Sequence, residues 1–229
     1  NVLTDISFKA KKGQTIAVIG STGSGKSTLI NLIPRYYDVT KGSVKVDGVD
    51  VRDMTQKELR DKLGYVPQKG VLFSGTIDSN IRYGKPEITD AQVKEAAEVA
   101  QATEFIDTKP EKYESPVSQG GTNVSGGQKQ RLSIARAIAK DPEIFIFDDS
   151  FSALDFKTDS QLRKALKEYT KDATTVIVAQ RISTILGADQ IIVLDDGHMA
   201  GIGTHKELMA NCEVYQQIAR SQLSEEELA

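Results

Sequence analysis

A glycine-rich stretch over residues 20–28 constrains this chain more than any other feature. It reads GSTGSGKST and fits the phosphate-loop pattern, in which a glycine is followed by four free positions and then Gly-Lys-Ser/Thr. Residues 15–19 before it are mostly apolar and rich in β-branched side chains, which predicts a buried strand. A helical pattern begins directly after the loop, over residues 27–32. This order of strand, loop and helix predicts a phosphate-binding site.

Glycines suit such a loop because they let the backbone wrap closely around phosphate with its N–H groups pointing inward. The start of the following helix adds a partial positive charge. We expect Lys26 to reach the β- and γ-phosphates and the Ser27 hydroxyl to bind Mg²⁺. The alternative is an ordinary glycine-rich turn, which the lysine and the flanking elements disfavour. The candidate phosphate-binding residues are Gly20, Ser21, Thr22, Gly23, Ser24, Gly25, Lys26, Ser27 and Thr28.

The composition sets the broad class of protein. With 229 residues, the chain can form one large domain or two small lobes with a real core. Its net charge of −3 argues against nucleic-acid binding as the main function. Cys212 is the only cysteine, so no disulfide can form within the chain, which suits a reducing cytosol. We interpret the chain, which begins without methionine or a visible secretory signal, as a segment of a longer protein.

Strands alternate with helices along the rest of the chain. Besides residues 15–19, strands are expected over residues 2–10, 42–51 with a turn at Asp47-Gly48, 64–66, 144–147, 174–179 and 190–194. Helices are expected over residues 55–63, 89–102 with Thr89 as N-cap, from 125 to before Pro142, 157–170, and from 207 onward. The pattern indicates an α/β fold with a mostly parallel core sheet, an antiparallel β layer and a mainly helical part over residues 75–142.

Several short motifs share the chain with the phosphate loop. Gln68 follows a short strand, Ser125-Gly126-Gly127-Gln128 opens a helix, and Asp148 and Asp149 end an apolar strand. In this order and spacing they resemble the nucleotide-binding domain of an ABC transporter, a P-loop NTPase, over nearly the whole chain. The matches are residues 20–28 to Walker A, 66–68 to the Q-loop, 124–128 to the signature motif with Val124 where leucine is usual, 144–149 to Walker B and 152–155 to the D-loop.

One stretch resembles the exporter branch of this family specifically. It comprises residues 72–77, Asn80-Ile81 and Tyr83-Gly84. The resemblance implies a single nucleotide-binding domain over residues 1–229, whose RecA-like core with its β layer covers about 1–74 and 143–229. Residues 75–142 would form the helical signature subdomain. ATP and Mg²⁺ are the implied cofactors, and the implied magnesium ligands are Ser27, Gln68 and Asp148.

The resemblance also implies partners. Two such domains form a head-to-tail dimer that sandwiches two ATP molecules, each held by the Walker motifs of one chain and the signature of the other. The helix N-terminus at Ser125, Gly126, Gly127 and Gln128 is an anion-binding end, which fits this role. The other implied partner is the transmembrane domain of an exporter, absent from this chain, which would hold it at the cytoplasmic side of the cell membrane. No nucleic-acid partner is expected.

Two departures from the family pattern fall on the catalytic step. Asp149 stands where the family usually has the glutamate that polarises the attacking water, and its carboxylate is set back by about 1.5 Å, one C–C bond. A misplacement of about 1 Å at a catalytic centre can cost on the order of 100-fold. Gln180 stands where the switch histidine is usual; it can donate a hydrogen bond but cannot titrate. With Gln68, these are the candidate catalytic residues.

Two more departures concern the borders of the site. Ser115-Pro116-Val117 replaces the usual Thr-Glu-Val of the exporter X-loop, so the glutamate that contacts the membrane domain in the family has no counterpart here. The aromatic residue that stacks on adenine would precede Val2, outside this chain. The four departures together resemble the degenerate-site half of a heterodimeric exporter. Such a half hydrolyses ATP slowly at its own Walker motifs, while its signature completes the active site of the partner.

Two other readings stay open. In the first, the chain belongs to a homodimeric exporter in which Asp149 and Gln180 work well enough. In the second, it is a non-transport ABC ATPase acting on DNA or the ribosome, or a regulatory ATP-binding module. Chromosome-structure relatives place long coiled coils between the phosphate loop and the signature, and no heptad run lies there in this chain.

Overall fold

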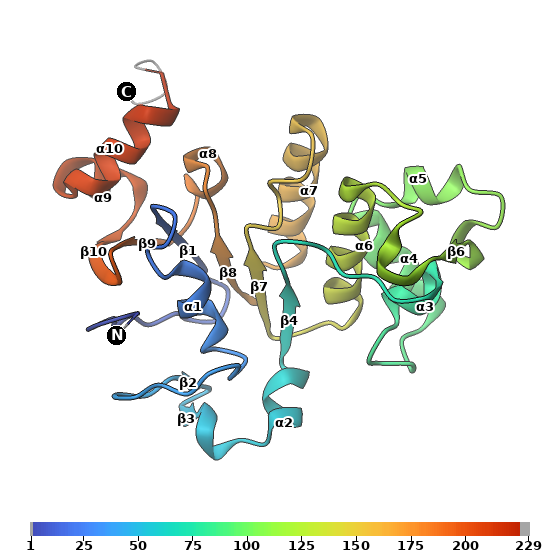
Figure 1. The fold of residues 1–229 in the computed structure, drawn as a ribbon, viewed down its shortest axis with the longest axis horizontal. Helices are drawn as coiled ribbons and strands as arrows, with labels where there is room; N and C mark the ends of the chain where they lie inside the picture. Colours follow the sequence, from blue (N-terminus) through green and yellow to red (C-terminus); the bar gives the residue numbers. More distant parts are fainter. Residues whose placement is uncertain (1, 225–229) are drawn as a thin grey trace.

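The computed structural model describes residues 2–224, and at their centre lies a six-stranded sheet. The strand order is β10-β9-β1-β8-β7-β4, with all neighbours parallel except the antiparallel edge strand β10 (Figure 1). The mostly parallel α/β sheet predicted from the sequence is therefore confirmed. The strands are β1 (Thr15–Gly20), β4 (Leu63–Val66), β7 (Ile144–Asp148), β8 (Thr174–Val178), β9 (Gln190–Asp195) and β10 (His198–Gly203).

Helices and loops cover both faces of this sheet, and strand β1 shows how. Ile16 and Val18 face one way, into a core shared with α1 (Lys26–Asn31) and α2 (Gln56–Asp61). Ala17 and Ile19 face the other way, into a core shared with α8 (Ile182–Ile185), α9 (His205–Asn211) and α10 (Glu213–Gln222). Because side chains alternate across a strand, burial on both faces requires the continuous apolar run seen in the sequence.

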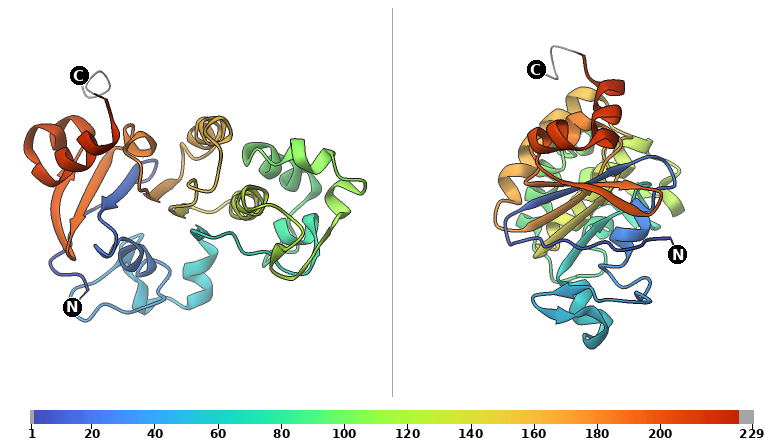
Figure 2. Two further views of the ribbon diagram at one scale, coloured as in Figure 1. Left: turned by 45° about the horizontal axis from the view of Figure 1, so that its top comes forward. Right: turned by 90° about the vertical axis from the view of Figure 1, so that its left-hand side faces the viewer.

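A second body of helices lies beyond β4 and β7, at the end of the molecule opposite α9 and α10 (Figure 2). Leu132 in α6 is fully buried in the core of this body. The mainly helical character expected for residues 75–142 is confirmed. The elements are α3 (Ile77–Ile81), α4 (Asp90–Val99), α5 (Thr103–Asp107) and α6 (Gly126–Ala139), the strand pair β5 (Gly75–Thr76) and β6 (Pro116–Val117), and α7 (Phe156–Tyr169), which packs against them.

Local capping explains where helix α4 begins and ends. The hydroxyl of Thr89, the predicted N-cap, accepts a hydrogen bond from the backbone N–H of Gln92 at 3.3 Å. The Gln92 side chain in turn accepts the Thr89 N–H at 2.9 Å, which completes a capping box. The helix stops at Val99, short of the predicted residue 102, because Gln101 adopts a left-handed conformation with φ 57°.

The strand expected over residues 2–10 is wrong. Leu3, Ile6 and Phe8 pack against the core as the alternation predicted, but the structure assigns no strand to this segment. The start of the segment is held by one backbone hydrogen bond, from the Thr4 N–H to the Gly197 carbonyl at 2.9 Å. Alternation reports one buried face, whereas a strand also needs a neighbouring ladder. The antiparallel layer therefore consists of the hairpin β2 (Lys45–Val46) and β3 (Val49–Asp50), with the predicted Asp47-Gly48 turn.

Three further elements differ from the sequence prediction. Strand β10 was missed, because Gly201 and Gly203 and a register shift after Met199 interrupt its pattern. The short helix α8 was also missed, and the helix expected from residue 207 onward is the pair α9 and α10.

Within residues 2–224, no helix has both the length and the apolar character needed to cross a membrane. The 3-10 turns of the described chain are Val51–Asp53, Lys112–Glu114 and Gln119–Gly121.

Candidate functional site

The phosphate loop leaves β1 and enters α1 through a tight turn that only glycine can make. A Cβ added to Gly20 would lie 2.2 Å from the Leu194 carbonyl oxygen, far inside van der Waals contact. Gly23 and Gly25 have φ angles of 83° and 99°, in the left-handed region that side chains disfavour. The fold thus places the loop at the end of a central strand, with the N-terminus of α1 directly behind it. This is the geometry of an anion site.

Lys26 supplies the positive charge of this loop. Its ammonium group donates hydrogen bonds to the carbonyl oxygens of Gly20 at 2.8 Å and Ser21 at 2.7 Å. Burial lowers the pKa of Lys26, and the negative charges of Asp149 and Asp148 oppose the shift. The lysine charge therefore faces both Walker B carboxylates across the loop.

Ser27 and Asp148 form an oxygen-rich pair beside the lysine. The Ser27 hydroxyl donates to Asp148 Oδ1 at 3.2 Å, and burial raises the pKa of Asp148. Tyr65 on β4 contacts the other oxygen of Asp148 at 3.5 Å and donates to Asn31 Oδ1 at 3.0 Å. A hydroxyl and a carboxylate are the hard oxygen ligands that Mg²⁺ prefers, so these residues fit the ion. Sequence reasoning missed Tyr65, which belongs to no motif and reaches the site only through the pairing of β4 with β7.

The three candidate catalytic residues meet at a single oxygen atom. Asp149 Oδ2 accepts one hydrogen bond from the Gln68 side-chain amide at 3.1 Å and one from the Gln180 side-chain amide at 2.7 Å. They follow the adjacent strands β4, β7 and β8, so the parallel sheet brings their ends to one edge. Here the Gln68 amide nitrogen donates to Asp149, whereas a magnesium ion would be bound by the amide oxygen. The role of Gln68 as a magnesium ligand therefore stays a prediction.

The backbone around Asp149 is held on both sides. Asp149 has φ 48°, and its N–H donates to the Val178 carbonyl at 2.9 Å. Its carbonyl accepts the Ser152 hydroxyl at 2.9 Å, which ties the start of the D-loop to the same residue. Burial raises the pKa of the Asp149 carboxyl, and the hydrogen bond from Gln68 opposes the shift. The carboxylate is thus a buried charge that its surroundings only partly compensate.

This burial predicts a pH-dependent effect of replacing Asp149 by asparagine. A carboxyl with a raised folded-state pKa loses stability as the pH rises through that pKa, so at pH 7 the ionised form costs stability. We expect Asp149→Asn to raise the thermal midpoint at pH 7 by a few degrees, at about 2–4 °C per kcal/mol. The gain should shrink as the pH falls toward 3.8, the ordinary value for aspartate. Thermal unfolding of both proteins across this range measures it.

Asp155 provides the matched control, because its pKa moves the other way. The backbone N–H of Thr158 lowers the pKa of the Asp155 carboxyl, which caps α7. Asp155→Asn should therefore lose stability at pH 7, and the loss should vanish at low pH. An Asp149→Asn protein that is less stable than the parent at pH 7 would contradict the prediction.

The predicted signature motif opens helix α6 as expected. The Ser125 hydroxyl accepts the Gln128 N–H at 3.2 Å, and the Gln128 side chain accepts the Ser125 N–H at 3.1 Å. A Cβ added to Gly126 would meet no atom within 4 Å, whereas one added to Gly127 would lie 3.6 Å from the Ala153 carbonyl. The signature therefore lies beside the D-loop, while the phosphate loop lies at α1, across β7 and β4 from it (Figure 1).

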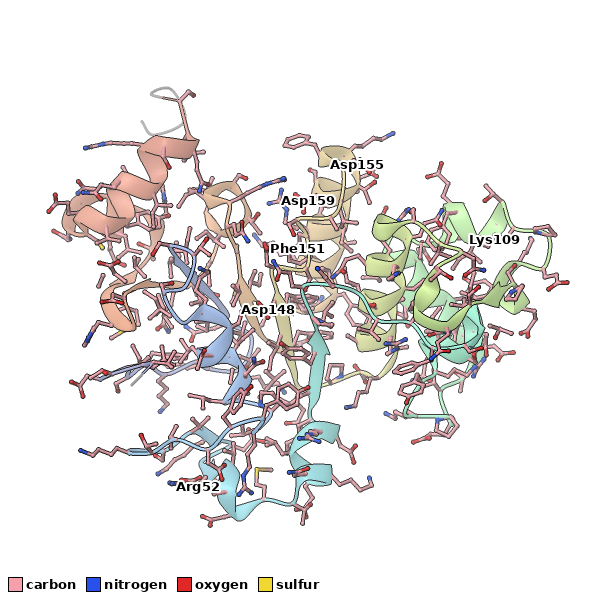
Figure 3. All side chains as sticks on the ribbon, viewed as in Figure 1. Arg52, Lys109, Asp148, Phe151, Asp155 and Asp159 are labelled. Carbon is pink, nitrogen blue, oxygen red and sulfur yellow. The ribbon has the colours of Figure 1, made fainter. Side chains whose placement is uncertain are left out.

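Figure 3 shows how the Walker B end leads to the D-loop: Asp148 lies in the middle of the molecule, and Phe151 and then Asp155 follow toward the start of α7. A pocket of about 450 Å³ lies along this path. Its walls include Asp149, Ser152, Gln180, Arg181 and Gln222. The pocket joins the catalytic candidates to the C-terminal helix α10.

The exporter-like stretch forms an exposed aromatic pair on the helical body. The rings of Phe73 and Tyr83 stack with centroids 4.0 Å apart, and Arg136 lies 5.3 Å from the first. Burial lowers the pKa of Arg136 to about 10, and its guanidinium donates to the Val71 carbonyl at 2.8 Å. The X-loop segment, whose sequence differs from the family pattern, lies close to this pair, because Pro116–Val117 pairs with Gly75–Thr76.

Comparisons with known proteins agree on one family. The profile of the ABC transporter family matches residues 3–152. An uncharacterized ABC transporter ATP-binding protein of Mycobacterium tuberculosis is 50% identical over 224 residues, which are 96% of this chain and 38% of that protein. A Staphylococcus aureus protein, named for multidrug export as an ATP-binding/permease protein, is 47% identical over 217 residues, 95% of this chain and 38% of that protein.

A solved structure shows the same fold. The structure of a bacterial Atm1-family ABC exporter with ATP bound matches this chain with a TM-score of 0.94 at 39% sequence identity. The match covers 98% of this chain and 40% of that chain. The chain thus spans 38% of the length of the two curated relatives.

Proposed function

This chain belongs to the ABC transporter family, an ATPase family whose ATP-binding domains bind ATP with Mg²⁺, and from that premise we propose that it is the ATP-binding domain of one half of an exporter. Its own Walker site holds MgATP and hydrolyses it slowly. Its signature motif, residues 125–128, completes the faster site of a partner domain. The phosphate loop binds the phosphates, and Ser27 and Asp148 hold Mg²⁺.

One observation carries the weak-hydrolysis part of the proposal: both side-chain amides beside Asp149 donate to the same carboxylate oxygen. A base that activates water must accept a hydrogen bond from that water. Two amide donors compete with the attacking water for Oδ2, and the hydrogen bond from Gln68 offsets part of the rise that burial causes in the pKa of Asp149. The shorter side chain of aspartate adds a positional loss. Gln180 cannot take up a proton in place of a histidine.

The separation of the two ATP-binding motifs supports a dimer. Ser125 and the glycines after it lie at a helix N-terminus, which favours anions, and Gly126 faces open space. The phosphate loop of the same chain lies across the sheet from them (Figure 1). In two copies of the fold arranged head to tail, the signature of each chain would face the phosphate loop of the other. Because the site departures require compensation, the partner in this proposal is a different chain with a glutamate and a histidine.

The proposal places the chain at the cytoplasmic side of a membrane, through a transmembrane domain outside this chain. Both curated relatives are longer, and one carries the word permease in its name. The exposed pair of Phe73 and Tyr83 is the surface we assign to that contact. In this arrangement residues 1–74 and 143–229 are the RecA-like core and residues 75–142 the signature subdomain; residues 1 and 225–229 lie outside the described part.

Gly126→Asp tests the proposed use of the signature. The added side chain meets no atom of its own chain, so the fold should persist, but its charge would repel the partner's γ-phosphate. We expect ATP turnover of the complete transporter to fall by about 100-fold or more, as for the loss of a preorganised donor. MgATP binding by this chain's own Walker site should be unchanged.

Gly187→Asp is the matched control. A Cβ at Gly187 also meets nothing within 4 Å, and this exposed glycine follows α8 rather than the signature. It should leave turnover near the parental value. Normal turnover in Gly126→Asp would refute the role of the signature. Loss of MgATP binding at this chain's own site would instead point to damage within the chain.

A further inference from the structure

Helix α8, which follows Gln180, has no N-terminal cap from its own sequence. The first N–H groups of a helix lack intrahelical partners and need acceptors. The residue at the cap position is Arg181, whose side chain accepts no hydrogen bond. The N–H of Ile182 instead donates to Gln222 Oε1 at 2.8 Å. Gln222 is the last residue of α10, so the start of α8 is capped by a distant helix.

The same Gln222 side chain makes a second bond to this segment. Its Nε2 donates to the backbone carbonyl of Gln180 at 2.7 Å. One amide thus satisfies an acceptor and a donor two residues apart, as a neighbouring strand would. The backbone of residues 180–182 is therefore held at two points, the Gln180 carbonyl and the Ile182 N–H.

Apolar packing places Gln222 where it can do this. Tyr215 and Ala219, on the inner face of α10, are fully buried together with Ile182 of α8. Helix α7 supports the segment from another direction, because Arg163 donates to the Ser183 carbonyl at 3.0 Å. The position of Gln180 is therefore set by two helices rather than by its own loop.

The chain of bonds continues to the centre of the site. Gln222 holds the Gln180 backbone, and the Gln180 side-chain amide donates to Asp149 Oδ2 at 2.7 Å. A small rotation of the 180–182 backbone would move that amide away from the carboxylate. The end of α10 and the catalytic candidates share a wall of the 450 Å³ pocket.

We propose that Gln222 is a positioning residue through which the C-terminal helix α10 fixes the Gln180 amide for nucleotide retention. This inference rests on the proposed function, in which the Walker site of this chain holds MgATP for long periods. Gln222 acts on the backbone of Gln180 and does not touch the nucleotide. Gln180 stands at the switch position, from which its amide can donate a hydrogen bond to the γ-phosphate, so the effect of Gln222 should be specific for the nucleotide that carries this phosphate.

The test compares release of labelled MgATP and MgADP from the complete transporter. In Gln222→Ala both bonds to the segment are lost, and in Gln222→Glu the bond to the Gln180 carbonyl becomes a repulsion. We expect the slow phase of MgATP release to accelerate by about three- to tenfold in either variant, the range of one net hydrogen bond. MgADP release should not change. Gln217→Ala, at an exposed glutamine of the same helix, should match the parent.

A double variant separates positioning from general loosening of the fold. In a Gln180→Ala background there is no amide to position, so adding Gln222→Ala should not accelerate MgATP release further. The thermal midpoint reports the structural cost in both backgrounds. The inference is overturned if Gln222→Ala leaves MgATP release unchanged, accelerates MgADP release equally, or has the same effect without Gln180. Absence of MgATP binding by the parent transporter would reject the proposed function itself.

Discussion

Replacing Lys26 by alanine is expected to lower the MgATP affinity of this chain's Walker site by about 100-fold or more. Lys26 is the cation of the phosphate loop, and its ammonium group lies within 2.8 Å of two loop carbonyls. A hydrogen bond to a charged group contributes about 1.5–3 kcal/mol, and the lysine should make more than one to the phosphates. Equilibrium binding of labelled MgATP to the complete transporter, with the partner's site inactivated, measures the change.

The fold should tolerate this substitution. Burial lowers the pKa of Lys26, so at neutral pH the charged ammonium group costs stability in the folded state. This cost grows as the pH falls from the ordinary value of 10.5 to the lower folded-state pKa and is constant below it. Removing the ammonium group offsets the loss of its bonds to the loop carbonyls, and we expect little change in the thermal midpoint. Lys45→Ala, at an exposed lysine of β2, is the control. Undiminished MgATP affinity in a folded Lys26→Ala protein would exclude the assigned phosphate site.

The parts of the molecule that the sequence predicted well are those specified locally. The phosphate loop needs a strand before it, a helix after it and glycines within it, and all of these lie within residues 15–31. The cap at Thr89 and the helix start at Ser125 were predicted for the same reason, since each of these residues bonds to a residue three positions on. In these cases the short sequence window contains both partners of the interaction.

The parts that could not be predicted depend on partners far along the chain. Residues 2–10 have the alternation of a strand, yet the neighbour that would complete a ladder is absent from the described structure. Tyr65 reaches Asp148 across 83 positions, and Gln222 reaches Gln180 across 42. Neither residue belongs to a motif, so no local sequence pattern could predict its contact.

The catalytic candidates fall between these extremes. The sequence indicated that Asp149 and Gln180 depart from the family at the same step, because both motifs could be recognised separately. It could not show that their side chains bond directly, or that Gln68 donates to the same oxygen. That geometry follows from the adjacency of β4, β7 and β8, which only the folded sheet determines. Because the two side chains share a hydrogen bond, the departures at Asp149 and Gln180 form one coupled change in the site.

The coupled change predicts that two substitutions together will restore hydrolysis at this site. In Asp149→Glu the carboxylate is extended by about 1.5 Å, beyond the point where both amides now hold it. In Gln180→His one competing amide donor is removed and a group that can carry a proton is introduced. We expect the double variant to raise turnover at this chain's Walker site by about 10- to 100-fold, within the range of general-base catalysis and positioning. Turnover is measured in the complete transporter with the partner's Walker site inactivated.

Each single variant should recover less than the double, because Asp149 and Gln180 share one hydrogen bond and their effects will not add. In Asp149→Glu alone the longer carboxylate still faces the Gln180 amide, and in Gln180→His alone the carboxylate stays set back. The same chemical changes at two exposed residues near α2, Asp53→Glu with Gln56→His, are the control and should alter nothing. If the double variant turns over no faster than the parent, Asp149 and Gln180 do not limit hydrolysis, and the slow site must be explained by elements beyond them. A rate already comparable to that of the partner's site before any substitution would favour the homodimeric reading, because the carboxylate held by two amides would then be a working base.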